Sequence, residues 1–239
     1  MNTTFFSLTP ILHPWVNHLT KEPQELFERI EQYGSPVNIH HFKPLNENIH
    51  AYQAVLNKYN VIHKIFFARK ANKCLQLAQT VADAGQGVDT ASLRELQQCL
   101  DAGIASEQLV LTAAVKNRQL LELALKYNVT VVLDNEDELQ LAQDVAATFG
   151  KPMLINIRVG GFLVNGQRLP TRFGFTIDSV AERIKRLAES YPQVKYNGLH
   201  FHLNGYSIDE RVAAIEQSVQ VIDELHDLGI HTRSLDIGG

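Results

Sequence analysis

Lys70 stands out because it follows the apolar residues 65–68, which are typical of a buried strand. An amine at the end of such a strand loses solvation, and burial favours its uncharged, nucleophilic form. In that form it can condense with a carbonyl group of a substrate or cofactor. The alternative is a lysine whose flexible stem carries the charge out to solvent. Position alone leaves both interpretations open.

Other polar residues also stand at or just beyond the ends of predicted strands. They are Asp89, Lys116, Asp134, Arg158, His200, His202 and Asp236. The carboxyl ends of the strands of a barrel converge on one mouth. A barrel would therefore gather these side chains around the same site as Lys70.

His200 and His202 are two residues apart on a predicted strand, so their side chains face the same side. Such a pair can ligate a metal, or it can stack an imidazole on a flat cofactor ring. The ordinary alternative is one packed histidine and one exposed histidine. No acidic ligand pattern accompanies the pair, so we predict no metal site.

Two glycines end the last predicted strand, in the stretch LDIGG at residues 235–239. Without side chains, Gly238 and Gly239 would let backbone N–H groups approach an anion closely, as phosphate-binding loops do. An ordinary turn explains two glycines equally well.

Short apolar runs alternate with helical patterns along the chain. The predicted strands are residues 64–68, 87–90, 108–112, 130–134, 153–159, 197–203 and 234–237. The predicted helices between them are residues 74–84, 93–102, 117–127, 136–149, 179–191 and 210–228. The first four strands recur about every 20–25 residues, which is the size of one strand–helix unit.

Seven strands in series predict an α/β fold, a (β/α)8 TIM-type barrel that stops before its last strand. A doubly wound sheet is the alternative. Residues 37–42 read as a lead-in strand before a helix at 46–59, and residues 160–174 read as a long polar loop. We expect an N-terminal lead-in segment at residues 1–35 and a barrel domain at residues 36–239.

Composition narrows the class of protein. The chain has 239 residues, 45% of them hydrophobic, and a formal net charge of -4. It can bury a large core, and it has neither a basic surplus for nucleic acid nor a Lys/Arg block for a membrane surface. Cys74 and Cys99 lack metal-ligand spacing and are expected to be free thiols. Residues 1–16 fit neither a signal peptide nor a spanning helix, so we expect a cytoplasmic protein.

Five stretches occur in the order typical of one family: FFARKANK, GVDTASLREL, TRFGF, GLHFHLNG and LDIGG. Through them the chain resembles the fold III, alanine racemase-like pyridoxal-phosphate enzymes. Within that group it is most similar to the diaminopimelate, ornithine and arginine decarboxylases, over residues 35–239. The resemblance implies a pyridoxal 5'-phosphate cofactor on a TIM-type barrel and an amino acid as substrate.

The resemblance also implies the catalytic residues. Lys70 matches the lysine that holds the cofactor as an internal aldimine. His202 matches the imidazole that stacks on the pyridine ring. On this basis the amine at the strand end exists to be consumed by imine formation, after which the ring withdraws electrons while the substrate carboxylate leaves as CO₂.

Further cofactor-binding residues follow from the same resemblance. Arg158 matches an arginine near the ring hydroxyl and the aldimine, and Asp89 matches an aspartate close to the lysine. His200 matches a second histidine of the diaminopimelate branch. Gly238 and Gly239 match the start of the glycine loop that binds the phosphate.

The chain departs from the family in two places. Asn204-Gly205-Tyr206 stands where the family has Gly-Ser and often Gln, so the serine that helps to hold the phosphate is absent. The chain also stops at Gly239, before the strand with the Glu-Pro-Gly stretch and before the β-domain. We therefore expect the N-terminal part of a longer enzyme, inactive or nearly so by itself, whose full-length form is a homodimer.

The predicted function is that of a pyridoxal-phosphate-dependent carboxy-lyase, a decarboxylase of a basic or dicarboxylic amino acid. An amino-acid racemase is the close alternative, because the barrel and the lysine are common to both. A non-catalytic, cofactor-binding or regulatory protein of the same fold is the third. The residues do not identify the amino acid.

Overall fold

In the computed structural model residues 12–239 are described, and the chain divides after His63 into two units. The first unit holds α1 (Pro14–Lys21), α2 (Gln24–Tyr33) and α3 (Lys43–Lys58), so the helix expected at 46–59 is present. The prediction of a strand at residues 37–42 is wrong. These residues have no regular structure, because the described part of this unit offers no strand to pair with. Residues 1–11, on which part of the expected lead-in segment falls, lie outside the described residues.

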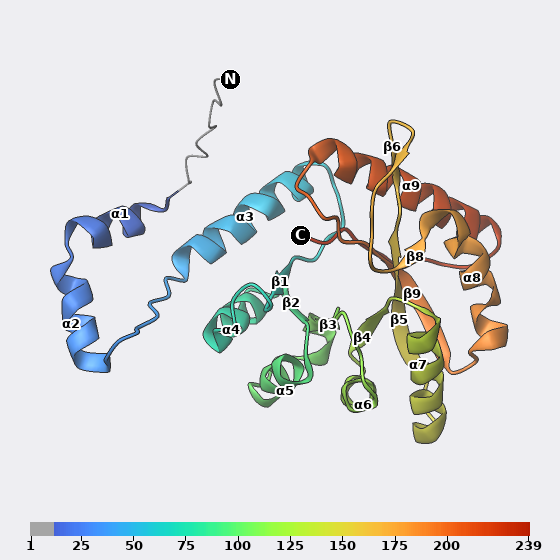
Figure 1. Ribbon diagram of the computed structural model, residues 1–239, viewed down its shortest axis with the longest axis horizontal. Coiled ribbons are helices and arrows are strands. Elements are labelled where there is room, and N and C mark those ends of the chain that lie inside the picture. The colour runs from blue at the N-terminus through green and yellow to red at the C-terminus, as the bar shows by residue number, and fades with distance from the viewer. Residues whose placement is uncertain (1–11) are drawn as a thin grey trace, which may run out of the picture. The chain divides into compact units, whose positions relative to one another are not determined.

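The second unit is built on parallel strands, and each one after the first pairs with the main strand before it in the chain. In sheet order they are β1 (Phe66–Ala68), β2 (Gly87–Thr90), β3 (Leu109–Leu111), β4 (Thr130–Leu133), β5 (Met153–Gly160), β9 (Val194–His200) and β10 (Ser234–Asp236). All seven predicted strands are confirmed. An order without reversal excludes a doubly wound sheet for the described residues. The sheet curls instead as part of a TIM-type barrel (Figure 1).

Helices cover the outer face of the curled sheet (Figure 1). They are α4 (Leu75–Asp83), α5 (Leu93–Asp101), α6 (Arg118–Tyr127), α7 (Glu136–Phe149), α8 (Ile177–Ser190) and α9 (Ile208–Asp227), with a short 3-10 turn at Ser106–Gln108. Side-chain caps explain where several of them begin. Ser92, Asn117, Asn135 and Ser207 each accept an N–H of the first turn of the helix that follows. The six helices predicted between the strands are confirmed, with boundaries moved by two residues at most.

The core lies between the sheet and these helices. Strand residues meet helix residues with no exposed surface, among them Val88, Leu111, Leu133, Ile155, Leu96, Leu121, Ala142 and Val145. Burial of this kind is the reason why the strands read as near-continuous apolar runs. The rigid layer that results leaves the strand ends as the place where polar side chains can gather.

The loop expected at 160–174 contains a hairpin, which corrects the sequence-based expectation. β6 (Leu163–Val164) and β7 (Gln167–Arg168) pair antiparallel across Asn165 and Gly166, both of which have positive φ. Asn-Gly is the pair that a two-residue hairpin turn favours, so the sequence did carry a signal for it. A short strand β8 (Phe175–Thr176) then pairs with the end of β5.

The two cysteines and the lengths of the helices are two further features of the described chain. Cys99 is buried and Cys74 is partly buried, and both are free thiols as predicted. None of the helices that the structure describes is long and apolar enough to cross a membrane.

Candidate functional site

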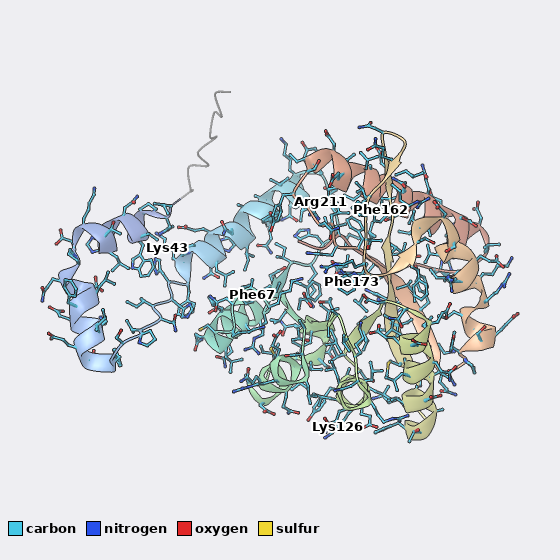
Figure 2. The ribbon with its side chains drawn as sticks, viewed as in Figure 1. Lys43, Phe67, Lys126, Phe162, Phe173 and Arg211 are labelled. Atoms are coloured by element: carbon cyan, nitrogen blue, oxygen red, sulfur yellow. The ribbon has the colours of Figure 1, made fainter. Side chains whose placement is uncertain are left out.

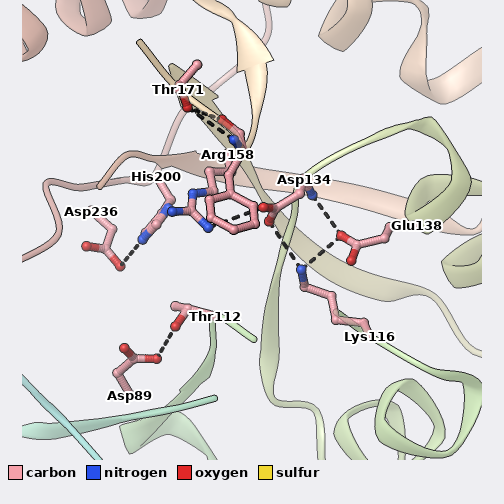
Figure 3. A network of polar contacts seen from close by, with 10 residues as sticks. Asp89, Thr112, Lys116, Asp134, Glu138, Arg158, Thr171, His200 and Asp236 are labelled. Atoms are coloured by element: carbon pink, nitrogen blue, oxygen red, sulfur yellow. Dashed lines mark hydrogen bonds and ion pairs between the residues drawn. The ribbon is translucent and has the colours of Figure 1, made fainter. Parts of the chain in front are cut away.

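The register of the sheet aligns polar residues at the carboxyl ends of neighbouring strands. Arg158 of β5 pairs with His200 of β9, and His200 pairs with Asp236 of β10. The register of β4 against β5 places Asp134, the first residue after β4, beside Arg158. These four residues therefore form one row across four strands (Figure 3).

A buried ion-pair network holds Arg158 in this row. Its Nη1 lies 3.2 Å from Asp134 Oδ2, and Lys116 Nζ lies 3.2 Å from the other oxygen of Asp134. Lys116 Nζ also lies 2.9 Å from Glu138 Oε2, which accepts the Asp134 N–H at 2.9 Å. The Lys116 side chain is wholly buried, so its charge depends on both carboxylates (Figure 3). Loss of any member would leave an unpaired charge, and this requirement fixes the arrangement.

The loop after the hairpin covers the Arg158 guanidinium. The centroid of the Phe173 ring lies 4.7 Å from Arg158 Cζ, within cation–π range. Gly174 makes this approach possible, because its φ is +85° and a Cβ there would lie 2.8 Å from the Arg158 carbonyl oxygen. Figure 2 shows Phe173 inside the curve of the sheet. The TRFGF stretch therefore holds the face of the arginine away from water.

His200 is buried in the row and is neutral. Its Nε2 lies 3.9 Å from Asp236 Oδ2, whereas Nδ1 has no hydrogen-bond partner among the described residues. Burial first, and then the charge of Arg158, lower the pKa of His200 to about 3. A neutral imidazole keeps one N–H and one acceptor nitrogen, so Nδ1 is free to bond with a group that enters the site.

The segments that follow β9 and β10 meet at Gly238. A Cβ there would lie 2.5 Å from the Phe201 carbonyl oxygen and 3.0 Å from His202 Nδ1, and φ of Gly238 is +64°. Only glycine allows this close approach. Arg211, at the start of α9 (Figure 2), donates to the neighbouring Ile237 carbonyl at 2.5 Å. The corner between half-exposed His202 and the glycines therefore carries a cation.

Lys70 lies in the turn after β1, in which the Ala71 N–H bonds to the Ala68 carbonyl at 3.1 Å. Its side chain is exposed, which differs from the desolvated amine expected from the sequence. The reason is that β1 is an edge strand with one neighbour among the described strands. Ala68 pairs with Asp89 in the register of β1 against β2, and the Arg69 N–H donates to the Asp89 carbonyl at 3.0 Å. The turn that carries Lys70 therefore lies at the mouth, beside the strand end that carries Asp89.

Asp89 lies in β2, at the position that pairs with Ala68 just before the lysine turn. Its Oδ1 accepts a hydrogen bond from Thr112 Oγ1 at 2.6 Å (Figure 3). Burial raises the pKa of Asp89 to about 6, although Thr112 and the Lys70 charge oppose the rise. A carboxyl group that titrates near neutrality beside an amine is typical of functional sites.

The structure thus brings together the polar residues that the sequence placed at strand ends. Gly239 follows Gly238 and is exposed. Sequence reasoning missed the supporting residues, which are Thr112, Glu138, Phe173 and Arg211. Only Glu138 carried a local signal, since it is the third helical residue after the cap Asn135, where a glutamate is typical. The others are recognisable only from contacts across the fold.

A cleft of about 270 Å³ adjoins His202. Its walls are residues 160–162 and 169–171 of the hairpin loop, residues 202–205, and Glu210. Asn204 Nδ2 donates to the Pro170 carbonyl at 2.7 Å and so joins the two walls. A larger cleft of about 520 Å³ lies between α7 and α8, and its walls are Glu136, Leu139 and residues of α8 with the adjoining Tyr191. Within residues 12–239, no group of His, Cys, Asp and Glu side chains could hold a metal ion.

Comparison with known proteins connects this geometry to a family. Residues 43–239 match the family described as pyridoxal-dependent decarboxylase, pyridoxal binding domain. An uncharacterized protein of Sinorhizobium fredii, y4yA, is 33% identical over 235 residues, which cover 97% of this chain and 50% of that protein. The diaminopimelate decarboxylase of Vibrio cholerae is 29% identical over 232 residues, which cover 92% of this chain and 55% of that enzyme.

Solved structures agree on the fold. The crystal structure of diaminopimelate decarboxylase from M. jannaschii is similar to this chain with a TM-score of 0.77 at 21% identity. The similarity covers 89% of this chain and 53% of that one. The chain therefore spans about half the length of the relatives that it matches.

Proposed function

The chain belongs to the pyridoxal-dependent decarboxylases, whose pyridoxal-binding domain it carries, and from this premise we propose that it is the barrel of an amino-acid carboxy-lyase. The cofactor is pyridoxal phosphate, and the proposed substrate is a basic or dicarboxylic amino acid such as diaminopimelate or lysine. Lys70 is the proposed attachment point. The observation that carries the proposal is the register of the sheet, which sets the Lys70 turn beside Asp89 at the same carboxyl ends of the strands as Arg158, His200 and Asp236.

The residues at the mouth fit the reactive end of the cofactor. Lys70 would hold the aldehyde end of the cofactor through its amine. Asp89, whose pKa is raised to about 6, is suited to exchange a proton near the amine at neutral pH. The unpartnered Nδ1 of His200 offers a hydrogen bond to a ring substituent, and half-exposed His202 offers its face to the ring.

The proposed phosphate end lies at Gly238 and Gly239. The close approach at Gly238 shows why a side chain is excluded there, and an anion at this corner would meet the cation of Arg211. Gly205 stands where the family has the phosphate-binding serine. We therefore add Arg211 to the proposed phosphate-binding residues, as a source of charge that the missing hydroxyl does not provide.

Pyridoxal phosphate, when bound, supplies the electron sink for decarboxylation. The chain's own residues supply position and polarity. The network of Lys116, Asp134 and Glu138 holds Arg158 at the mouth, and the Phe173 ring covers its guanidinium against water. His200 remains neutral beside Arg158 and so adds no second positive charge to the centre of the row.

Several parts of the proposal concern the whole protein rather than the described barrel. We propose that the 239 residues alone are nearly inactive, because the relatives that they match are about twice as long. A homodimer in the full-length form and a cytoplasmic location also remain predictions. The divergent Asn204-Gly205-Tyr206 stretch lines the cleft beside His202 in part, so it is a proposed determinant of the substrate.

The attachment of the cofactor is tested directly with Lys70→Ala. We expect the wild-type chain to gain a visible absorbance band when pyridoxal phosphate is added, and borohydride to fix the cofactor mass on the peptide that contains Lys70. The variant should show neither signal, because it lacks the amine of the turn beside Asp89. Lys195→Ala, which alters an exposed lysine near the start of β9, is the matched control and should behave as wild type. Equal signals from wild type and Lys70→Ala would remove Lys70 from its role.

The reaction class is tested by CO₂ release from a panel of amino acids that includes diaminopimelate, lysine, ornithine and arginine. The measurement uses this chain and, where the reading frame continues past Gly239, the longer product. We expect release from one basic or dicarboxylic amino acid by the longer product. Racemisation of the same amino acids without CO₂ would overturn the proposed class.

A further inference from the structure

Arg69, the residue immediately before Lys70, is buried without any exposed surface. An arginine keeps its charge at every physiological pH, so full burial requires strong compensating contacts. None of the contacts at the mouth described above uses this side chain. Its burial beside an exposed lysine therefore needs its own explanation.

The guanidinium of Arg69 joins the lysine turn to α5. Nη2 donates to the Lys73 carbonyl at 2.8 Å and to Gln98 Oε1 at 3.1 Å. Nη1 donates to the Glu95 carbonyl at 2.9 Å and lies 3.6 Å from Cys99 Sγ. The hydrogen bond to the Lys73 carbonyl closes residues 69–73 into a turn around the guanidinium. The other contacts fix the guanidinium to α5. A planar guanidinium can donate hydrogen bonds to all of these acceptors at once, whereas a lysine amine cannot reach them all.

Glu95 extends the connection to the end of β2. Its buried carboxylate forms an ion pair with Lys73 through Oε1 and accepts the Ala91 N–H through Oε2 at 2.9 Å. Ala91 follows Asp89 by two residues. The lysine turn is thus tied, through the start of α5, to the same segment that presents the Asp89 carboxyl group.

We propose that Arg69 is a positioning residue, which fixes the turn of Lys70 relative to Asp89 and thereby sets how readily the amine binds the aldehyde of pyridoxal phosphate. The inference rests on the proposed function. It follows from two observations taken together. The Lys70 side chain is exposed on an edge strand, so packing does not hold it, and its turn is instead held from below by Arg69. Small displacements of a reacting group have large effects on its reaction.

Arg69→Lys tests the proposal, because it keeps the buried positive charge but loses the fork that reaches Lys73, Gln98 and Glu95. Arg94→Met changes an exposed arginine of the same helix and is the matched control. Two readouts are taken. Hydrogen exchange of the amides of residues 70–73 and 91 is measured without cofactor. The affinity for pyridoxal phosphate, and the pH midpoint of the absorbance band, are measured by titration.

For Arg69→Lys we expect faster exchange at residues 70–73, a shifted pH midpoint and about tenfold weaker cofactor binding, as the loss of charged hydrogen bonds implies. Arg94→Met should match wild type in all three. If Arg69→Lys does not fold, Gln98→Met, which removes one acceptor at a partly exposed position, decides by the same readouts. Wild-type exchange, midpoint and affinity in the folded variant would overturn the proposal.

Failure of the proposed function would look different. In that case wild type and Lys70→Ala would give the same absorbance after addition of pyridoxal phosphate, and the exchange measurement would still report on the turn. If wild type binds through Lys70 and the Arg69 variants match it, only the positioning role fails.

Discussion

Two buried residues near the same mouth show how desolvation acts in opposite directions. It lowers the pKa of His200 to about 3 and raises the pKa of Asp89 to about 6. Both shifts favour the uncharged form. At neutral pH the histidine is therefore without charge, and the aspartate is the group of this pair whose protonation changes between about pH 5 and 7.

Asp89→Asn should stabilise the protein at high pH. Because burial raises the pKa of Asp89 above its ordinary value of 3.8, its contribution to stability is fully present below that pH and is lost as the pH rises through about 6. The neutral variant avoids that loss, so we expect its free energy of unfolding to exceed that of wild type by up to about 3 kcal/mol at pH 8. Urea unfolding without cofactor at pH 4 and pH 8 measures the difference, which should shrink at pH 4.

The control for this prediction is Asp83→Asn, which neutralises an exposed carboxylate on α4. It should change the free energy of unfolding little at either pH. A stability difference for Asp89→Asn that is the same at pH 4 and pH 8 would contradict the raised pKa. A gain in stability at this position would also mean that the charged carboxylate is kept for a purpose other than folding.

At the level of elements, the loop after the hairpin is held on Arg158 by one glycine. Gly174 and Gly166 both have positive φ, but only at Gly174 would a Cβ collide, at 2.8 Å from the Arg158 carbonyl oxygen. Gly166→Ala should therefore lower the free energy of unfolding by only about 1 kcal/mol, through backbone strain. Gly174→Ala should lower the free energy of unfolding by more and should also displace Phe173 from the Arg158 guanidinium.

Thermal unfolding of the two glycine variants measures the effect of backbone strain on stability. Titration with pyridoxal phosphate measures the effect of the loop position on cofactor binding. We expect weaker cofactor binding for Gly174→Ala and unchanged binding for Gly166→Ala. Equal cofactor affinities in the two variants would show that the loop does not set the geometry of Arg158.

Most of these helices and strands were predictable because their local sequence pattern matches the place that each one takes in the fold. The strands read as apolar runs because they are buried, and helices such as α7 begin where Asn135 provides a cap. Residues 37–42 have strand-like composition but no partner strand among residues 12–63, so the prediction there was wrong. The hairpin at 163–168 was missed because its strands are only two residues long, although Asn165 and Gly166 signalled the turn.

The sequence predicted that the polar residues of the candidate site gather at one mouth, but it did not predict the residues that hold them in place. Lys70, Arg158 and the two histidines stand at strand ends, and the barrel topology alone brings such positions together. The burial of Arg69 depends on acceptors about 25–30 residues away on α5, which no local pattern reveals. The exposure of Lys70 was one of the two alternatives that the sequence left open, since an apolar run does not say whether its strand lies at the edge of a sheet.

At the scale of the whole molecule, the two units are joined by an exposed stretch. Tyr59 to Ile62 have no helix or strand and are exposed, and Ile62 is fully so. Limited proteolysis with chymotrypsin should therefore cut after Tyr59 first and leave a resistant fragment that begins at residue 60 and contains the second unit. Mass spectrometry of the early products checks this. Early cuts within the strands or within α4 to α9 would contradict the division.

The strand order has a consequence for how the protein is made. Each main strand pairs with the one synthesised before it, so every new strand leaving the ribosome finds its neighbour already formed. Assembly can then proceed from β1 to β10 in the direction of translation. The turn of Lys70 is finished early, and Asp236 is the last member of the polar row to arrive.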